Sequence, residues 1–274
     1  MGQRPDLPPH VVDLWYAYVS DLIASDSVEN HYKILSCPER ERIEQFALPR
    51  VRDESLAARL LVRRVLSFYA NIPPQNWQFG QKMRGKPFVE APWEGFDAFN
   101  LAHSANLVVC AVAAEGQVGV DVESLDRMTT GLPLARRFFA SAEVEQLMEL
   151  PAALRREAFL QIWTLKEAYI KAIGDGMALP LDQFFFDLSA TAPARLHLSG
   201  KQERLATEWL FAQCRLASRH HISLGVTNDA IAGEKEKSRV VIRARELKSL
   251  SSPIPDAFTV CSQKNGWFFV ADSK

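Results

Sequence analysis

The 274-residue sequence predicts an α+β fold made of two similar halves that divide near Glu115. Two observations support this prediction. Each half shows a long helical pattern beside strand patterns, and each is long enough to bury a core of its own. The composition, 47% hydrophobic and 24% charged, is that of an ordinary globular protein. No letter-by-letter repeat relates the halves, so the order of the elements alone indicates an internal duplication.

Residues 54–69 predict the long helix of the first half. One stripe holds its apolar side chains, namely Leu56, Leu60, Leu61, Val65, Leu66 and Phe68. Three arginines lie largely off that stripe: Arg59, Arg63 and Arg64. The Pro73-Pro74 pair a few residues later stops the helix.

Strand patterns follow this helix and surround a second helical region. The strands are predicted over residues 107–112, 118–123, 184–188, 208–213 and 221–226. The second helical region covers residues 136–173 and is broken near Leu150-Pro151. It stops at Gly174-Asp175-Gly176, which is a strong signal for a helix C-terminus.

These patterns divide the chain into three segments. We expect an N-terminal half over residues 1–115 and a C-terminal half with a metal site over residues 116–228. Residues 229–274 combine a charged stretch, a strand-like piece at Val240 to Ile242 and a Ser/Pro-rich stretch, so we expect a partly disordered tail or appendage there.

Charge and hydropathy exclude several classes of protein. A net charge of -1 with a pI of about 6.6 provides no general field for nucleic acid or an anionic membrane. The longest apolar run, Leu107 to Ala114, is too short to span a bilayer, and the N-terminus shows no apolar signal region. Four widely spaced cysteines give no zinc-binding pattern. We therefore expect a soluble, cytoplasmic protein with reduced thiols.

Asp121 and Glu123 are the first candidate site residues. Residues two apart on a strand point to the same face, so the two carboxylates converge. Like charges this close are unfavourable unless a cation lies between them, and Mg²⁺ prefers oxygen ligands of this kind. The alternative is an edge strand with a solvated face.

A second candidate group lies on the long helix of the C-terminal half. Trp163, Glu167 and Lys171 are spaced four residues apart and lie on one side of that helix. Glu167 could complete a metal site, and Lys171, one turn later, could meet a phosphate. The alternative is an ordinary surface pair of Glu and Lys beside a core tryptophan.

Two further motifs lie in the first half. Gly85-Lys86-Pro87 is a tight basic turn that could grip a phosphate, and His103-Ser104 precedes a buried strand. The structural alternative is a simple turn for the first motif and a structural histidine for the second. The sequence contains no G-x-S-x-G elbow, no Walker A loop and no G-x-G-x-x-G fingerprint.

Together, these motifs closely resemble the 4'-phosphopantetheinyl transferases of the Sfp type. The resemblance rests on Gly85-Lys86-Pro87, Asn100-Leu101-Ala102-His103-Ser104, Gly119-Val120-Asp121-Val122-Glu123 and the segment Trp163 to Ala172, in that order. It covers roughly residues 36–226. The His motif reads Leu-Ala-His-Ser where many relatives have Ile-Ser-His-Ser, but His103 itself is present.

The resemblance implies an enzyme that moves the phosphopantetheine arm of coenzyme A onto a serine of an apo carrier protein and releases adenosine 3',5'-bisphosphate. It also implies two halves related by a pseudo-twofold axis, with the active site in the cleft between them. Mg²⁺, with Mn²⁺ as an alternative, would be held by Asp121, Glu123 and Glu167. Glu167 and Lys171 would be the catalytic residues, with Glu167 as general base. The residues implied to bind coenzyme A are Arg42, Gln81, Lys82, Gly85, Lys86, Pro87, Asn100, His103, Lys166 and Lys171.

The implied partners are acyl, peptidyl or aryl carrier domains and coenzyme A, with no nucleic acid or membrane partner. Because both halves lie in one chain, we expect a monomer. Two alternatives remain open: a non-catalytic binder of coenzyme A or carrier protein, and a Mg²⁺-dependent phosphohydrolase with no protein acceptor. The intact set Asp121, Glu123, Glu167 and Lys171 argues against a degenerate binder.

Overall fold

The fold was determined as a computed structural model. It describes residues 7, 11–83, 85–92, 95–126, 131–174, 179–187, 194–198, 209–216, 219–227, 241–250, 259–260, 262–264 and 267–269.

The first half begins with a strand, continues through four helices and ends in four strands. These elements are β1 (Val11–Tyr18), α1 (Val19–Ala24), α2 (Val28–Ile34), α3 (Cys37–Glu44), α4 (Pro49–Tyr69), the short 3₁₀ helix η1 (Pro74–Asn76), β2 (Phe79–Gln81), β3 (Pro87–Val89), β4 (Phe99–Ser104) and β5 (Leu107–Ala113).

The second half follows the same plan and is succeeded by short C-terminal strands. Its elements are β6 (Val118–Ser124), α5 (Gly131–Phe138), α6 (Ser141–Glu149), α7 (Ala152–Ile173), the 3₁₀ helix η3 (Leu181–Gln183), β7 (Phe184–Asp187), β8 (Arg195–Leu198), β9 (Trp209–Leu216) and β10 (His220–Thr227). The C-terminal strands are β11 (Val241–Glu246), β12 (Thr259–Val260), β13 (Ser262–Lys264) and β14 (Trp267–Phe269).

The two halves repeat one topology. The first sheet has the order β12-β11-β1-β5-β4, and the second has the order β13-β14-β9-β10-β6. The run β1-β5-β4 therefore corresponds to β6-β10-β9. In each half a long helix and a two-stranded hairpin lie between the first strand and the last two, namely α4 with β2-β3 and α7 with β7-β8. The predicted fold class, two similar α+β halves, is confirmed.

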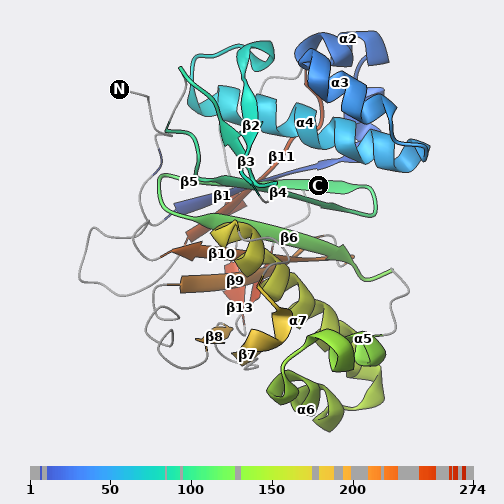
Figure 1. The fold of residues 1–274 in the computed structure, drawn as a ribbon, viewed down its shortest axis with the longest axis vertical. Coiled ribbons are helices and arrows are strands. Elements are labelled where there is room, and N and C mark those ends of the chain that lie inside the picture. The colour runs from blue at the N-terminus through green and yellow to red at the C-terminus, as the bar shows by residue number, and fades with distance from the viewer. Residues whose placement is uncertain are drawn as a thin grey trace.

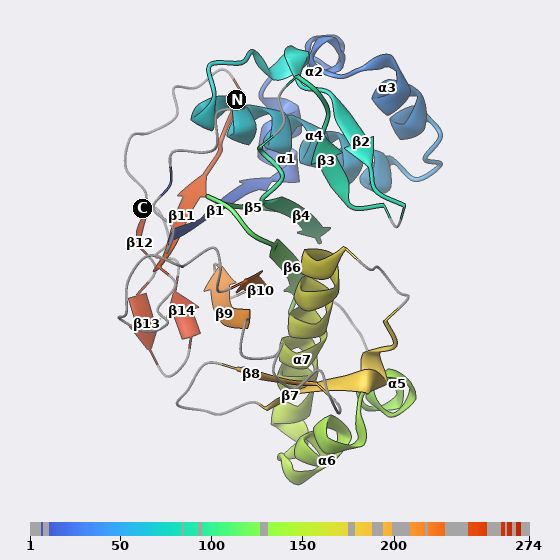
Figure 2. The same ribbon diagram turned by 60° about the vertical axis from the view of Figure 1, so that its left-hand side comes forward.

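The halves pack through their sheets. One face of each sheet contributes to a shared apolar core that includes Leu14, Val109, Val120 and Ile222. On the outer face of the first sheet, α4 packs through Leu60, and α7 covers the outer face of the second (Figures 1 and 2). The layers therefore run helices, sheet, sheet, helices.

The long helices agree with the predicted patterns except at their ends and at two side chains. α4 begins five residues earlier than predicted, at Pro49, whose fixed φ suits the first turn of a helix. Arg63, predicted to lie off the apolar stripe, is fully buried, whereas Phe68, predicted to lie on it, is more than one third exposed. The second helical region divides into α5, α6 and α7. As predicted, α7 ends at Gly174, where φ is +74°.

The segment predicted as a tail contributes strands to both sheets. β11 pairs in parallel with β1, from Val11 opposite Val241 to Tyr16 opposite Glu246. β12 pairs with β11, and β14 pairs in parallel with β9 of the second sheet. Residues 229–240 and 251–258 of this segment lie outside the described residues, and the boundaries of all three segments stay a prediction.

A buried carboxylate anchors β11 to β1. Asp13 is fully buried and accepts hydrogen bonds from Arg243 Nε and Nη2, at 2.6 and 2.8 Å. Tyr69 of α4 donates its hydroxyl to the same carboxylate at 2.5 Å, and the Trp15 indole donates to Tyr69 at 2.8 Å. This network joins β1, α4 and β11.

Within the described part of the chain, no helix is long and apolar enough to cross a membrane. Three of the four cysteines, Cys37, Cys110 and Cys214, are free thiols. The cytoplasmic location stays a prediction.

The Arg243–Asp13 contact predicts a large loss of stability in Arg243→Ala. Removing the guanidinium leaves a buried carboxylate without its cation, which costs about 3 kcal/mol of unfolding free energy. The matched control is Arg219→Ala, because Arg219 pairs with Asp126 at 3.9 Å and both side chains are largely exposed. Urea denaturation should show less than about 1 kcal/mol for the control. Equal losses in the two variants would contradict this assignment.

Candidate functional site

The site begins where α7 lies directly on β6. Alternate residues of β6 face the shared core, and the others, among them Gly119 and Asp121, face α7. A Cβ atom at Gly119 would lie 2.0 Å from the Ala168 carbonyl oxygen and 2.6 Å from the Ala172 amide nitrogen. Only a glycine allows the helix backbone to come so close. This contact brings the polar residues of α7 next to those of β6.

Asp121 and Lys171 form the central ion pair. Lys171 Nζ donates to Asp121 Oδ1 at 2.5 Å, whereas Asp121 Oδ2 is buried and has no hydrogen-bond partner. Burial, together with the charges of Glu167 and Glu123, raises the pKa of Asp121 to about 6, although Lys171 opposes the shift. The Lys171 charge therefore does not fully offset the effects of burial and of the neighbouring carboxylates on Asp121.

Glu167 and Glu123 complete a group of three carboxylates. Burial, with a smaller contribution from Glu123, raises the pKa of Glu167 above its ordinary value. Ser104 of β4 donates its hydroxyl to Glu123 Oε2 at 2.9 Å. Since β4 belongs to the first half and β6 to the second, this hydrogen bond ties the two halves together at the site.

The carboxylates offer a donor set that fits a divalent cation, although they do not enclose one in this arrangement. Among the residues that the structure describes, no group of three or more His, Cys, Asp or Glu side chains is placed to hold a metal ion. Lys171 holds one oxygen of Asp121. The other oxygen is buried and unpaired, and the neighbouring acidic charges help to raise the pKa of Asp121 and of Glu167. Both features favour a hard cation such as Mg²⁺.

His103 lies close to this group. It is the last residue but one of β4, and its side chain is about half exposed. Its Nδ1 lies 3.4 Å from Oε2 of Glu54 on α4. Burial lowers the pKa of His103, the charges of Lys171 and Arg50 lower it further, and Glu54 opposes the shift. The ring therefore lies between the long helix of the first half and the end of α7.

The predicted basic turn also reaches α7. Gly85 has φ of +88°, which a glycine adopts easily. Lys86 Nζ donates to the Ala172 carbonyl in the last turn of α7 at 2.6 Å. Burial and, to a smaller extent, the charge of the exposed Lys82 lower the pKa of Lys86 to about 8. The β2-β3 hairpin of the first half therefore touches the helix of the second.

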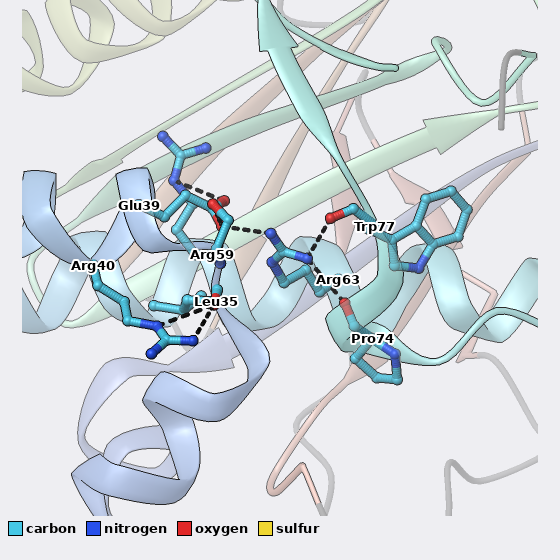
Figure 3. A network of polar contacts seen from close by, with 8 residues as sticks. Leu35, Glu39, Arg40, Arg59, Arg63, Pro74 and Trp77 are labelled. Atoms are coloured by element: carbon cyan, nitrogen blue, oxygen red, sulfur yellow. Dashed lines mark hydrogen bonds and ion pairs between the residues drawn. The ribbon is translucent and has the colours of Figure 1, made fainter. Parts of the chain in front are cut away.

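A cavity of about 500 Å³ opens beside that hairpin. It is lined by Ser36, Pro38, Glu39, Arg42, Arg59, Gln78, Phe79, Gly80, Gln81 and Glu90. Two of these residues, Arg42 and Gln81, were predicted to bind coenzyme A. Glu39 pairs with Arg59 and with the buried Arg63, whose Nη1 donates to the carbonyls of Pro74 and Trp77 (Figure 3). Through its contact with Glu39, the buried Arg63 holds this part of the cavity wall in place.

The structure separates two predicted residues from this site. Lys166 is fully buried, and its Nζ donates to Glu143 at 2.8 Å and to the carbonyls of Leu181 and Phe184 at 2.6 Å. These contacts join α7 to α6, η3 and β7. Asn100 is also buried, and its Oδ1 accepts from the Val120 amide at 3.0 Å, joining β4 to β6. Neither side chain lies open to a ligand.

Sequence reasoning missed several residues that line or support the site, namely Glu54, Ser104, Arg59 and Glu39. Glu54 and Glu39 belong to charged helical stretches in which nothing distinguishes them from solvated surface residues. Ser104 was noted only as a neighbour of His103, and Arg59 as a residue off the apolar stripe.

Two family models match the chain. The model of the 4'-phosphopantetheinyl transferase superfamily matches residues 117–224, and that of the 4'-phosphopantetheinyl transferase N-terminal region matches residues 24–115.

Several named relatives belong to the same family. The 4'-phosphopantetheinyl transferase HetI of Nostoc sp. is 40% identical over 59% of this chain and 68% of its own length. The 4'-phosphopantetheinyl transferase gsp of Aneurinibacillus migulanus is 38% identical over 50% of this chain and 55% of its own. The human L-aminoadipate-semialdehyde dehydrogenase-phosphopantetheinyl transferase is 29% identical over 69% of this chain and 65% of its own. The matches thus span between about half and two thirds of these relatives.

The chain belongs to the 4'-phosphopantetheinyl transferase family. The family and the class of enzyme predicted from the sequence are therefore confirmed. Among solved structures, holo-[acyl-carrier-protein] synthase of Thermotoga maritima matches 40% of this chain and 62% of its own, with 22% identity and a TM-score of 0.33. Nothing further rests on a likeness of that degree.

The helix contact at Gly119 predicts that Gly119→Ala is strongly destabilising. The added methyl group meets the backbone of α7, which cannot move without separating Asp121 from Lys171, so we expect a loss of about 3 kcal/mol. The matched control is Gly225→Ala on the neighbouring strand, directly opposite Gly119. Its methyl group would meet a ring atom of Phe211 at 2.8 Å, and that side chain can yield. Chemical denaturation should show about 1 kcal/mol for the control. Equal effects would contradict the central role of Gly119.

Proposed function

We propose that this protein transfers the 4'-phosphopantetheine group of coenzyme A to a serine of an apo carrier protein, with Mg²⁺ as cofactor. The serine oxygen attacks the phosphorus atom that bears the pantetheine arm, and the bond from that phosphorus to the bridging oxygen breaks. The products are holo carrier protein and adenosine 3',5'-bisphosphate. The observation that supports this most strongly is the meeting of Asp121, Glu167 and Lys171 where α7 lies on β6, in a chain of this family.

Coenzyme A, the donor of the phosphopantetheine group, would extend across both halves. The cavity that holds Arg42, Arg59 and Gln81 suits the nucleotide end, because two arginines and polar side chains can bind a phosphate and a base. From there the pyrophosphate would reach His103 and Lys171. Lys86, now bound to the Ala172 carbonyl, is close enough to that path to exchange its partner for a phosphate.

Asp121, Glu167 and Glu123 would hold the divalent cation, and Lys171 would then turn from Asp121 to the pyrophosphate. When bound, the cation supplies positive charge that offsets the charge on the leaving group. The chain's own residues do the rest: Lys171 and His103 orient the pyrophosphate, and the buried walls of β6 and α7 restrict access of water.

Glu167 would accept the proton of the attacking serine. Its carboxyl group lies in the same group as Asp121, and burial raises its pKa toward the range in which a carboxylate is an effective base.

The acceptor would be an acyl, peptidyl or aryl carrier domain. Because the first half supplies the cavity and His103, and the second supplies the carboxylates, one chain would hold a complete site and act as a monomer. A coenzyme A binder without activity and a Mg²⁺-dependent phosphohydrolase are the competing functions that the following assay separates.

The intact mass of an apo carrier protein tests the proposed transfer. After incubation with this protein, coenzyme A and Mg²⁺, the carrier should gain one phosphopantetheine. The gain should vanish with a chelator or in Asp121→Ala, and it should persist in Asp126→Ala, whose side chain is largely exposed. Consumption of coenzyme A without a change in the carrier would indicate a hydrolase. Binding without consumption, across several carrier types, would indicate a binder.

Glu167→Gln should reduce kcat by about 10²–10⁴-fold if Glu167 is the base, with smaller changes in coenzyme A affinity. The control is Glu145→Gln, an exposed position on α6 that should keep the wild-type rate. Steady-state rates are measured over a range of Mg²⁺ concentrations. A rate restored by high Mg²⁺ would mean that Glu167 serves only as a ligand, and a near-normal rate would remove it as the base.

A further inference from the structure

Glu54 is a buried carboxylate in the first half that the proposed reaction does not yet use. It lies in the second turn of α4 and is only 6% exposed. Its Oε1 lies 3.4 Å from Arg50 Nη1, and its Oε2 lies 3.4 Å from His103 Nδ1. A buried carboxylate is costly unless it is paired. Arg50 is largely exposed and one helical turn away, so this pair contributes little. His103 is therefore the partner that accounts for the position of Glu54.

The contact with Glu54 determines how His103 presents its ring. A carboxylate at Nδ1 keeps the hydrogen on that nitrogen and fixes the orientation of the imidazole, as carboxylates do for metal-bound histidines. The other ring nitrogen, Nε2, then remains for a ligand on the exposed side. Since the His103 side chain is about half exposed, a ligand can reach Nε2 from solvent.

The charges around His103 oppose its protonation, and Glu54 counters them. Arg50 of α4 and Lys171 of α7 both act against a positive ring, as does burial. Nδ1 and Nε2 can both donate hydrogen bonds only when the ring is protonated. A phosphate accepts hydrogen bonds and carries negative charge, so it needs a donor at Nε2. Among the groups named, Glu54 is the one whose charge favours that form.

We propose that Glu54 is a positioning residue, which holds His103 by Nδ1 and balances its charge so that Nε2 donates to a phosphate group of coenzyme A. The inference rests on the proposed function, because it takes coenzyme A as the ligand. It adds a residue of α4 to a site whose predicted residues lie on α3, the β2-β3 hairpin, β4, β6 and α7.

A double-mutant cycle tests this inference. The affinity for coenzyme A is measured by calorimetry for the wild type, Glu54→Gln, His103→Ala and the double variant, with thermal melting to compare their stability. Glu54→Gln keeps the size of the side chain and should weaken binding about tenfold. The double variant should bind no more weakly than His103→Ala alone, because Glu54 acts through His103. Asp53→Asn, the neighbouring acid of α4, is the control and should bind as the wild type does.

A second measurement does not depend on coenzyme A. The NMR titration of the His103 ring in the free protein should show a lower pKa in Glu54→Gln than in the wild type, and Glu54→Asp should restore part of the difference. Additive losses in the double variant, wild-type affinity in Glu54→Gln, or an unchanged His103 titration would each overturn the inference. A wild-type protein that fails to bind coenzyme A would instead overturn the proposed function, and the inference with it.

Discussion

The backbone contact between α7 and β6 at Gly119 is the constraint on which the site depends. Because position 119 has no side chain, the helix axis lies close enough to the strand for Lys171 to reach Asp121 and for Glu167 to share its electrostatic surroundings. A larger residue would hold the helix away and separate Asp121 from Glu167. The raised pKa of Asp121 and its unpaired oxygen follow from this close packing, and they are the features that suit a divalent cation.

The duplicated fold is used asymmetrically. Both halves place a long helix on the outer face of a sheet, yet the carboxylates lie on β6 and α7 of the second half. The first half instead provides His103 and Glu54, together with the basic turn and the arginine-lined cavity. Hydrogen bonds from Ser104 to Glu123 and from Lys86 to the Ala172 carbonyl cross between the halves. These contacts would keep a coenzyme A molecule that spans both halves in a fixed position relative to the carboxylates.

Much of the fold could be predicted because the two long helices have clear apolar stripes and the glycine and proline signals mark their ends. The strand β1 was missed because it is buried on both faces and shows no alternation. A strand-like piece at Val240 to Ile242 indicated part of β11, but its pairing with β1 was missed because that partner lies some 230 positions away. The motifs led to Asp121, Glu167, Lys171 and His103. Lys166 shows the limit of motif reasoning: it follows Leu165 and precedes Glu167 in the motif, yet its direction on the helix points it at the buried Glu143. Nothing in the sequence relates Glu54 to His103, since their contact forms only when α4 covers the sheet.

The most direct test of this account is a crystal structure of the protein with coenzyme A and Mg²⁺. The account predicts the pyrophosphate between His103 and Lys171, the cation on oxygens of Asp121 and Glu167, and the nucleotide end in the cavity lined by Arg42, Arg59 and Gln81. Coenzyme A bound away from the junction of β6 and α7, or a cation held by other residues, would contradict it.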